Sequence, residues 1–252
     1  MESKKIYLAS DFHLGLDIPE SSAVREKKIV AWLDAIKADC GQLYLVGDVF
    51  DFWFEYTAAI PKGHTRLLGK LAEFCDAGIE VSLFTGNHDM WMFEYFQKEL
   101  GVKLFKSGVE RQFFGKSYFI AHGDGLGPGD TGYKIIKAIF SNPICQFLFH
   151  RLHPNLGLGL MKYISKGGRL GEDKINDIPE KEKEWLVQFA RSYLKDSKHI
   201  DHFVFGHRHF AMSYPLAPHS STLHYLGDWL HFNTYMRIDE QGPAILEYHN
   251  PD

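Results

Sequence analysis

The chain has 252 residues, of which 45% are hydrophobic, and its formal net charge is −4. It can therefore bury a substantial core, and we find no repeat, low-complexity stretch, signal peptide or transmembrane span. The cysteines Cys40, Cys75 and Cys145 are widely spaced and lack a C-x-x-C pair, which predicts reduced, buried thiols in a cytoplasmic protein. We expect residues 1–252 to form one domain with an insertion.

The predicted elements alternate between strands and helices along most of the chain. Short apolar runs predict strands at 5–9, 43–46, 79–84, 117–121 and 202–205. A helix is predicted over 23–38, where Ile29, Leu33 and Ile36 recur on one face. Short runs at 223–226, 234–238 and 244–248 predict a C-terminal antiparallel meander. Two facing sheets with helices outside, an α/β (α+β) architecture, would accommodate both patterns.

Residues 128–180 interrupt this alternation. The segment has no strand-like run and is dense in aromatic and aliphatic residues, and between positions 133 and 174 seven lysines and arginines stand against two acidic residues. We predict a helical lid that contacts anionic lipid headgroups and offers acyl chains an apolar groove. The alternative is that these helices pack on the core and expose their charges to solvent.

Five short motifs follow the predicted strands. They read D-F-H (11–13), G-D-V-F-D (47–51), G-N-H-D (86–89), A-H-G-D (121–124) and G-H-R-H (206–209). Each motif alone is typical of an ordinary turn, but five turns that each carry a metal-binding side chain favour a metal centre. Because loops at strand ends carry the chemistry of α/β proteins, we expect the side chains to converge. The candidate ligands are Asp11, His13, Asp48, Asn87, His122, His207 and His209.

The ligand types indicate the number and kind of ions. Imidazole nitrogens with carboxylate and amide oxygens, and no thiolate, suit Mn²⁺, Fe or Zn²⁺ better than Mg²⁺ alone. Four histidines are too many for one catalytic ion, so we predict two divalent ions, with Asp48 as the candidate bridge. Two ions about 3.5–4 Å apart would clamp the attacking and leaving oxygens of a displacement at phosphorus.

In their order and spacing, the five motifs resemble those of the calcineurin-like metallophosphoesterases. The resemblance implies a four-layer α/β/β/α sandwich with a helical insertion. It also implies that Asp11, His13, Asp48 and His209 hold one metal, and that Asp48, Asn87, His122 and His207 hold the other. His88 would act on the phosphate or the leaving group as an electrostatic or general-acid partner, and Asp51 would orient it.

Further motifs extend the resemblance to nearly the whole chain. D-F-H-L-G, G-D-V-F-D-F-W, H-G-D-G-L, G-D-T-G-Y, S-N-P-I-C-Q-F-L-F, a late S-K and L-G-D-W are similar to the hydrolases that cleave the pyrophosphate of UDP-2,3-diacylglucosamine in lipid A biosynthesis. This implies water attack on the α-phosphorus, release of UMP and 2,3-diacylglucosamine 1-phosphate, and Mn²⁺ as the cofactor. The protein would lie peripherally on the cytoplasmic face of the inner membrane.

The same resemblance suggests which residues bind the substrate. Asp130 and Ser165 would meet the glucosamine headgroup; the alternative is that Asp130 caps the helix that starts near Tyr133 and that Ser165 caps a turn. Asn87 and His207 would lie near the phosphates, together with His88.

One pair departs from the best-known lipid A hydrolases, which have arginine at position 88 and glutamate at position 51. A histidine and an aspartate can also lend a proton to the leaving group. A soluble phosphodiesterase or nucleotide pyrophosphatase with another substrate therefore stays open, as does a binding module that has kept the fold. Nucleic acid is not expected as a substrate, because the body of the chain is acidic. The sequence leaves the oligomeric state open.

Overall fold

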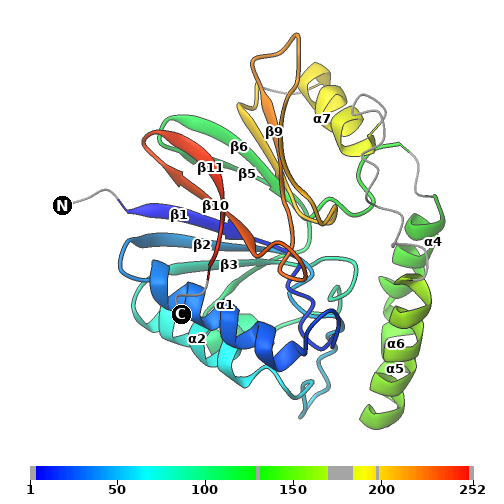
Figure 1. Ribbon diagram of the computed structural model, residues 1–252. Helices are drawn as coiled ribbons and strands as arrows, with labels where there is room; N and C mark the ends of the chain where they lie inside the picture. Colours follow the sequence, from blue (N-terminus) through cyan, green and yellow to red (C-terminus); the bar gives the residue numbers. More distant parts are fainter. Residues whose placement is uncertain (1–3, 129–130, 170–183, 197–198, 250–252) are drawn as a thin grey trace.

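A computed structural model describes residues 4–128, 131–169, 184–196 and 199–249 (Figure 1). Within its helices, the side chains of residues 131–133, 135–136 and 162–169 lie outside the description.

The first sheet has six strands in the order β11-β10-β1-β2-β3-β4. Four of them run parallel: β1 (Lys5–Ala9), β2 (Cys40–Val46), β3 (Glu80–Phe84) and β4 (Lys103–Phe105). The hairpin of β10 (Thr234–Asp239) and β11 (Gly242–Glu247) extends the sheet antiparallel to β1. The outer face is covered by α1 (Ser22–Ile36), α2 (Thr65–Asp76) and α3 (Tyr95–Leu100). Helix α1 forms as predicted and buries Ile29, Leu33 and Ile36.

The second sheet has five strands in the order β5-β6-β7-β9-β8. Its central strands run parallel: β6 (Lys116–Ala121), β7 (His202–Phe205) and β9 (Thr222–Leu226). The edge strands β5 (Val109–Phe113) and β8 (Ala211–Pro215) are antiparallel to their neighbours. Helix α7 (Trp185–Asp196) covers the outer face through Leu186, Val187 and Ala190.

The two sheets face each other across an apolar layer. Leu8, Tyr44 and Phe84 of the first sheet pack in one cluster with Ile120 and Val204 of the second. Helices, sheet, sheet and helix therefore form four layers, which Figure 1 shows from the side. The predicted fold class is confirmed. The fold arises because side chains along each strand alternate between the layer between the sheets and the faces that the helices cover.

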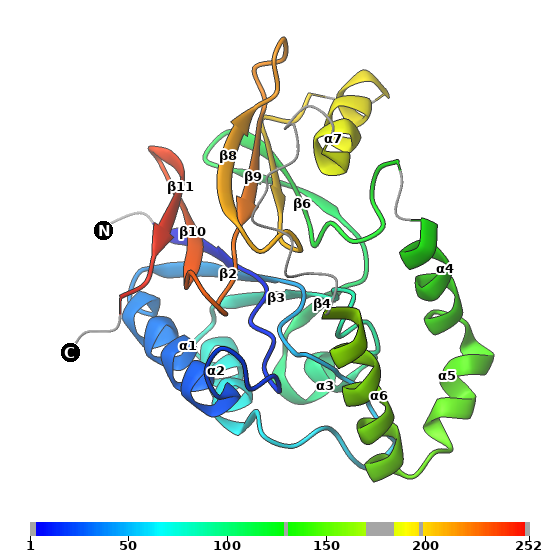
Figure 2. The same cartoon turned by 45° about the vertical axis from the view of Figure 1, so that its right-hand side comes forward.

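Three further helices stand beside the sheets, next to the ends of β1, β2 and β3 (Figures 1 and 2). They are α4 (Thr131–Phe140), α5 (Pro143–His150) and α6 (Pro154–Arg169), and all fall in the segment that was predicted to be helical. Helix α5 begins at a strong local signal, since Pro143 occupies its first turn and the Asn142 side chain accepts a hydrogen bond from the Ile144 N–H at 2.8 Å. Among the described helices, none combines the length and the apolar character needed to cross a bilayer.

Two sequence expectations were wrong. The C-terminal runs do not form one meander, because β9 pairs with β7 in the second sheet, whereas β10 and β11 belong to the first. Local periodicity predicts that a strand exists but not which strand it pairs with. Cys40 is buried as expected, but Cys75 and Cys145 are partly exposed. Strands β4, β5 and β8, which are short or half exposed, were not predicted.

Candidate metal centre

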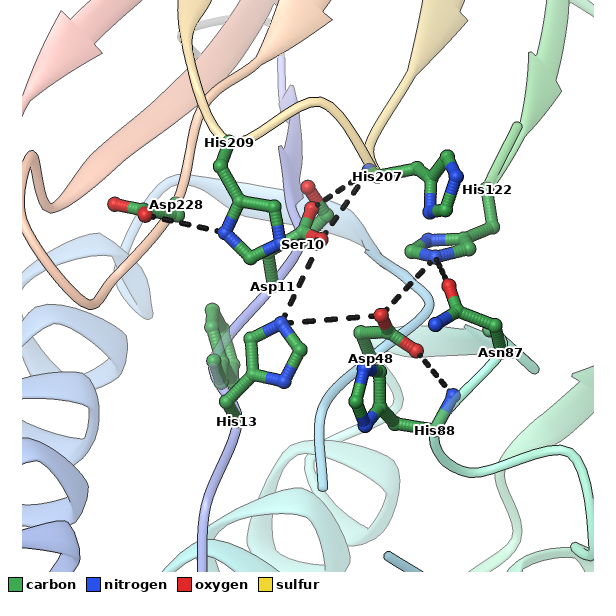
Figure 3. Close-up of polar contacts among 12 residues, drawn as sticks. Ser10, Asp11, His13, Asp48, Asn87, His88, His122, His207, His209 and Asp228 are labelled. Atoms are coloured by element: carbon green, nitrogen blue, oxygen red, sulfur yellow. Dashed lines mark hydrogen bonds and ion pairs between the residues drawn. The ribbon is translucent and has the colours of Figure 1, made fainter. Parts of the chain in front are cut away.

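The five motifs meet at one end of the two sheets. The loop after β1 supplies Asp11 and His13, and the loops after β2, β3, β6 and β7 supply the remaining candidate ligands. Figure 3 shows their side chains turned toward a common centre. The parallel strands of both sheets place their carboxyl ends on this side, so residues far apart in sequence come together.

The loops hold strained backbone at the ligands. Asp11, His13, Asp48, His207 and His209 all have positive φ, between 45° and 66°, a region that costs a non-glycine residue about 1–3 kcal/mol. Hydrogen bonds between loops oppose this strain: the Asp11 N–H donates to the Gly47 carbonyl at 3.1 Å, and the His13 N–H donates to the Asp48 carbonyl at 2.9 Å.

Glycine next to a ligand has a steric reason. A Cβ on Gly86 would lie 2.1 Å from Asp48 Oδ1, and one on Gly47 would lie 2.5 Å from His122 Nδ1. Both positions therefore require glycine so that two ligand loops can approach each other.

Asp11, His13 and His209 form one candidate group, whose ligand atoms lie within 4.8 Å of one another. Asp11 Oδ1 is 3.6 Å from His209 Nε2 and 3.9 Å from His13 Nε2. Ligand atoms that each bind an ion at about 2.0–2.2 Å must lie within roughly 4 Å of each other, so these residues fit a shared cation.

Asp48, His122 and His207 form the second group. Asn87 belongs beside it, because its Oδ1 is 3.2 Å from His122 Nε2. Asp48 Oδ2 lies 3.3 Å from His122 Nε2 and 3.8 Å from His13 Nε2, between the two groups, while its Oδ1 accepts the His88 N–H at 2.9 Å. One oxygen of Asp48 is thus held by backbone and the other faces both groups, as a bridging carboxylate requires.

Asp51 contacts two imidazoles. Its Oδ1 lies 3.7 Å from His88 Nδ1 and 3.7 Å from His13 Nδ1. The sequence predicted the contact with His88 but not the one with His13. A carboxylate on the Nδ1 side of His13 orients the Nε2 side toward the ligand groups, which is the usual outer partner of a metal-binding histidine.

Other ligands have outer partners that the sequence did not reveal. Asp228 is fully buried, and its Oδ2 accepts from His209 Nδ1 at 3.2 Å. His122 Nδ1 faces the Val46 carbonyl at 2.9 Å, which likewise leaves Nε2 for the centre. Asp228 lies in the L-G-D-W motif, which resembles a motif of the lipid A hydrolases. That motif was the sequence signal that could have pointed to Asp228.

The charges of the second group compensate each other. Burial opposes ionisation of Asp48, but the imidazoles of His122 and His88 outweigh it and hold the pKa of the carboxyl well below its usual range. Burial likewise opposes protonation of His122, but the Asp48 carboxylate raises its pKa well above the ordinary value. A divalent ion bound beside Asp48 would therefore displace a proton from His122.

The first group differs in its carboxylate, because burial raises the pKa of Asp11 to about 6. The pKa of His209 is raised to about 9, because Asp11 and Asp228 overcome the effect of burial. Burial lowers the pKa of His13 to about 3 and, in the second group, that of His207 to about 3, so both are neutral at pH 7 and have the protonation state that metal binding requires.

An aromatic cluster joins the centre to the helices beside it. Phe149 of α5 packs with ring centroids 4.7 Å from Phe54 and 4.7 Å from Trp91, and Trp91 Nε1 donates to the Phe140 carbonyl at 2.7 Å. Phe54 and Trp91 follow the G-D-V-F-D and G-N-H-D motifs. The helices are therefore anchored next to the ligand loops.

Two predicted substrate residues cannot be placed. Asp130 lies outside the described residues, and Ser165 lies in α6 where only the backbone is described. A cavity of about 350 Å³ opens between the Asp51 side of the centre and α6. Its lining includes Phe52, Lys62 and Leu158.

Comparison with known proteins agrees with this geometry. A sequence profile described as "Calcineurin-like phosphoesterase" matches residues 4–211. A UDP-2,3-diacylglucosamine hydrolase of Porphyromonas gingivalis is 37% identical over 92% of this chain and 92% of its own length. A UDP-2,3-diacylglucosamine hydrolase of Pseudomonas fluorescens is 26% identical over 96% of this chain and 95% of its own. The chain belongs to the calcineurin-like phosphoesterase family.

Proposed function

We propose that this protein is a metal-dependent hydrolase that cleaves the pyrophosphate of UDP-2,3-diacylglucosamine to UMP and 2,3-diacylglucosamine 1-phosphate. The observation that carries the proposal is the convergence of two ligand groups around Asp48. They lie beside the aromatic cluster of Phe54, Trp91 and Phe149, which holds helices α4–α6. Full-length similarity to hydrolases of this lipid nucleotide supports it.

Two divalent cations, with Mn²⁺ as the expected ion, fit the donor set. Asp11, His13, Asp48 and His209 would hold one, and Asp48, Asn87, His122 and His207 the other. When bound, the pair would supply Lewis acidity at the phosphates and lower the pKa of water. The protein's part is to hold imidazoles of fixed tautomer and one shared carboxylate in a buried site.

His88 and Asp51 would act on the substrate side. The His88 ring meets the His13 ring edge-on at 4.8 Å, so it lies at the border of the ligand groups. We assign it the electrostatic or general-acid role at the leaving phosphate, with Asp51 as its orienting carboxylate. Asn87 and His207 would also meet the phosphates, and Asp130 and Ser165 the glucosamine headgroup.

Residues 128–180 would form a lid on a single domain spanning residues 1–252. Two observations support this: Phe149 of α5 packs on Phe54 and Trp91, and a cavity lies between α6 and the loop of Asp51. Acyl chains bound there would contribute about 0.8 kcal/mol for each buried CH₂ group.

The lid also exposes apolar side chains to solvent, which favours contact with a membrane. Phe147 and Leu148 of α5 are 56% and 60% exposed, and the Arg151 guanidinium lies 4.8 Å above the Phe147 ring. Apolar side chains flanked by a cation are typical of surfaces that lie in the headgroup region. We infer a peripheral association with the cytoplasmic face of the inner membrane. The apolar side chains of this surface are Ile139, Ile144, Phe147, Leu148, Leu152, Leu156 and Leu160.

Hydrolysis of two substrates by the purified protein with Mn²⁺ tests the activity. UDP-2,3-diacylglucosamine should be cleaved to UMP with a kcat/KM at least 100-fold above that of the deacylated nucleotide sugar. Equal kcat/KM values would instead support a soluble nucleotide pyrophosphatase, the alternative that the His88–Asp51 pair leaves open. Turnover of a generic phosphodiester without any turnover of the lipid nucleotide would refute the proposal.

Sedimentation with vesicles that contain anionic phospholipid tests the membrane contact. The protein should bind them, and the double substitution of Phe147 and Leu148 by serine should release it while cleavage of a soluble phosphodiester persists. The double substitution of Ile18 and Val24 by serine is the control, because both are exposed apolar residues outside α4–α6, and it should leave binding unchanged. Equal binding by all three proteins would refute the assigned surface.

A further inference from the structure

A buried arginine lies behind the loop that carries Asp11 and His13. Arg25 belongs to the first turns of α1, and none of its surface is exposed. Its Nε donates to the Phe12 carbonyl at 2.8 Å, and one Nη donates to the His13 carbonyl at 2.9 Å and to that of Leu16. The other Nη reaches the Glu20 carbonyl at 3.4 Å.

These contacts converge on one short stretch of backbone. The carbonyls of residues 12, 13 and 16 point at the same guanidinium, although carbonyl dipoles directed at one point repel each other. A planar cation with five N–H donors satisfies several of them at once. The stretch also includes His13 and adjoins Asp11, which have φ values of 45° and 58°. A strained conformation of this kind persists only where its surroundings determine it.

We propose that Arg25 is a positioning residue for the metal site formed by Asp11, His13 and His209. It holds the peptide groups on both sides of His13 in the orientation that turns the His13 imidazole and the Asp11 carboxylate toward the centre. This inference rests on the proposed metal-dependent function, and it adds a residue that lies 12 positions from His13 in the sequence and touches no substrate.

The expected effect is selective. Without the guanidinium, the carbonyls of residues 12, 13 and 16 lose their common donor, and the loop can relax toward ordinary φ values. Asp11 and His13 then move. Asp48, Asn87, His122 and His207 stand on other loops, and the link from the moving loop to His207 is the His207 N–H, which donates to the Asp11 carboxylate at 3.0 Å. One of two metal sites should weaken strongly, and the other should change little.

Glu26 offers a matched control. It is the next residue of α1 and is only 2% exposed, so it is buried like Arg25. Its carboxylate accepts from the Arg66 and Leu67 N–H groups at 2.9 and 3.0 Å, at the start of α2. A change at Glu26 therefore tests the loss of a buried charged side chain on the same helix, without a contact to the ligand loop.

The experiment is a calorimetric Mn²⁺ titration of the full-length wild type, Arg25→Met, Arg25→Lys and Glu26→Gln, with thermal unfolding of each protein. The wild type should bind two ions. Arg25→Met should keep one site and weaken the other by about 10–100-fold, as for the loss of an outer partner of a ligand. Arg25→Lys should lie between, because an ammonium cannot reach all three carbonyls. Glu26→Gln should lower Tm without changing either affinity.

Activity gives a second readout. Phosphodiester hydrolysis by Arg25→Met should need at least 10-fold more Mn²⁺ for half-maximal rate, and saturating Mn²⁺ should restore most of kcat with KM unchanged. If Arg25→Met binds both ions with the affinities of the wild type, the inference is overturned, whatever the Tm of the variant. If Arg25→Met does not fold, two wild-type affinities in folded Arg25→Lys would overturn it instead. A wild type that binds no Mn²⁺ would instead refute the metal centre itself.

Discussion

Asp228→Asn isolates the part played by the outer partner of a metal ligand. The Asp228 carboxylate has three donors: His209 Nδ1 at 3.2 Å on Oδ2, and the N–H groups of His231 and Phe232 at 2.9 and 3.2 Å on Oδ1. Burial opposes its ionisation, but these hydrogen bonds, led by that from His209, hold the pKa of Asp228 below its usual value. Every donor therefore faces a charged oxygen.

Asparagine has one acceptor oxygen where aspartate has two. If that oxygen serves the two backbone N–H groups, the NH₂ group faces His209 Nδ1, which must then accept, so the ring proton moves to Nε2 and blocks metal binding. If the oxygen serves His209, the NH₂ group faces the buried backbone donors, which costs about 1–3 kcal/mol for each donor left unpaired. Either orientation weakens the site.

The expected loss is about 10–100-fold in affinity for the ion at Asp11, His13 and His209, or about 1.4–2.7 kcal/mol. The assay is the Mn²⁺ concentration at half-maximal phosphodiester hydrolysis, measured beside Asp34→Asn as an exposed control. kcat at saturating Mn²⁺ should recover to within a few-fold of the wild type. An unchanged Mn²⁺ requirement in Asp228→Asn would refute the assignment of Asp228.

Three further outcomes are expected. Asp48→Ala should lose at least one metal and all turnover, whereas His88→Ala should keep both metals and slow hydrolysis by about 10²–10⁴-fold. Equal metal loss in the two variants, measured by elemental analysis, would contradict this division of roles. Gly86→Ala should lose Mn²⁺ binding while keeping the helical circular dichroism signal, because the new Cβ would lie 2.1 Å from Asp48 Oδ1; Gly69→Ala, which meets nothing within 4 Å, should bind normally. Burial lowers the pKa of His224 to about 3, so this neutral side chain takes up a proton on unfolding below about pH 6.5, and the free energy of unfolding falls as the pH drops from there toward 3. His224→Gln should reduce this fall by up to about 1.4 kcal/mol per pH unit in urea titrations, and an identical slope would count against the buried neutral form.

The candidate ligands could be predicted because their signals are local. A buried strand ends, a glycine or a tight turn follows, and a metal-binding side chain stands next to it. Gly47 and Gly86 show the reason in space, since a Cβ at either position would collide with a ligand residue of another loop. The motifs of Gly47 and Gly86 therefore each contain a ligand and the glycine that lets two ligand loops approach each other. Both are recognisable within a few residues of sequence.

The partners of these ligands could not be predicted in the same way. Asp228 reaches His209 from 19 positions away, and Arg25 reaches the His13 carbonyl from α1, where a charged residue in an amphipathic helix is normally expected to face solvent. Burial of a charge depends on groups supplied by distant segments, so it has no local pattern. The pairing of β9 with β7 was missed for the same reason, because a strand's partner is set by the tertiary fold.

Helix α4 of the proposed lid is joined to one of the ligand loops, and this contact would link substrate entry to ligand geometry. Lys137 of α4 forms an ion pair with Asp124, two residues after His122. Outside the proposed lid, Glu184 lies 3.2 Å from the Nε of Arg208, which stands between His207 and His209, and the Arg208 guanidinium lies 4.4 Å from the Trp185 ring at the start of α7. A displacement of α4 would therefore act on the loop that carries the candidate ligand His122. Because packed loops of this kind adopt discrete arrangements rather than deforming continuously, we expect a closed lid to favour one geometry of the metal centre, so that binding of the acyl chains would contribute to catalysis as well as to affinity.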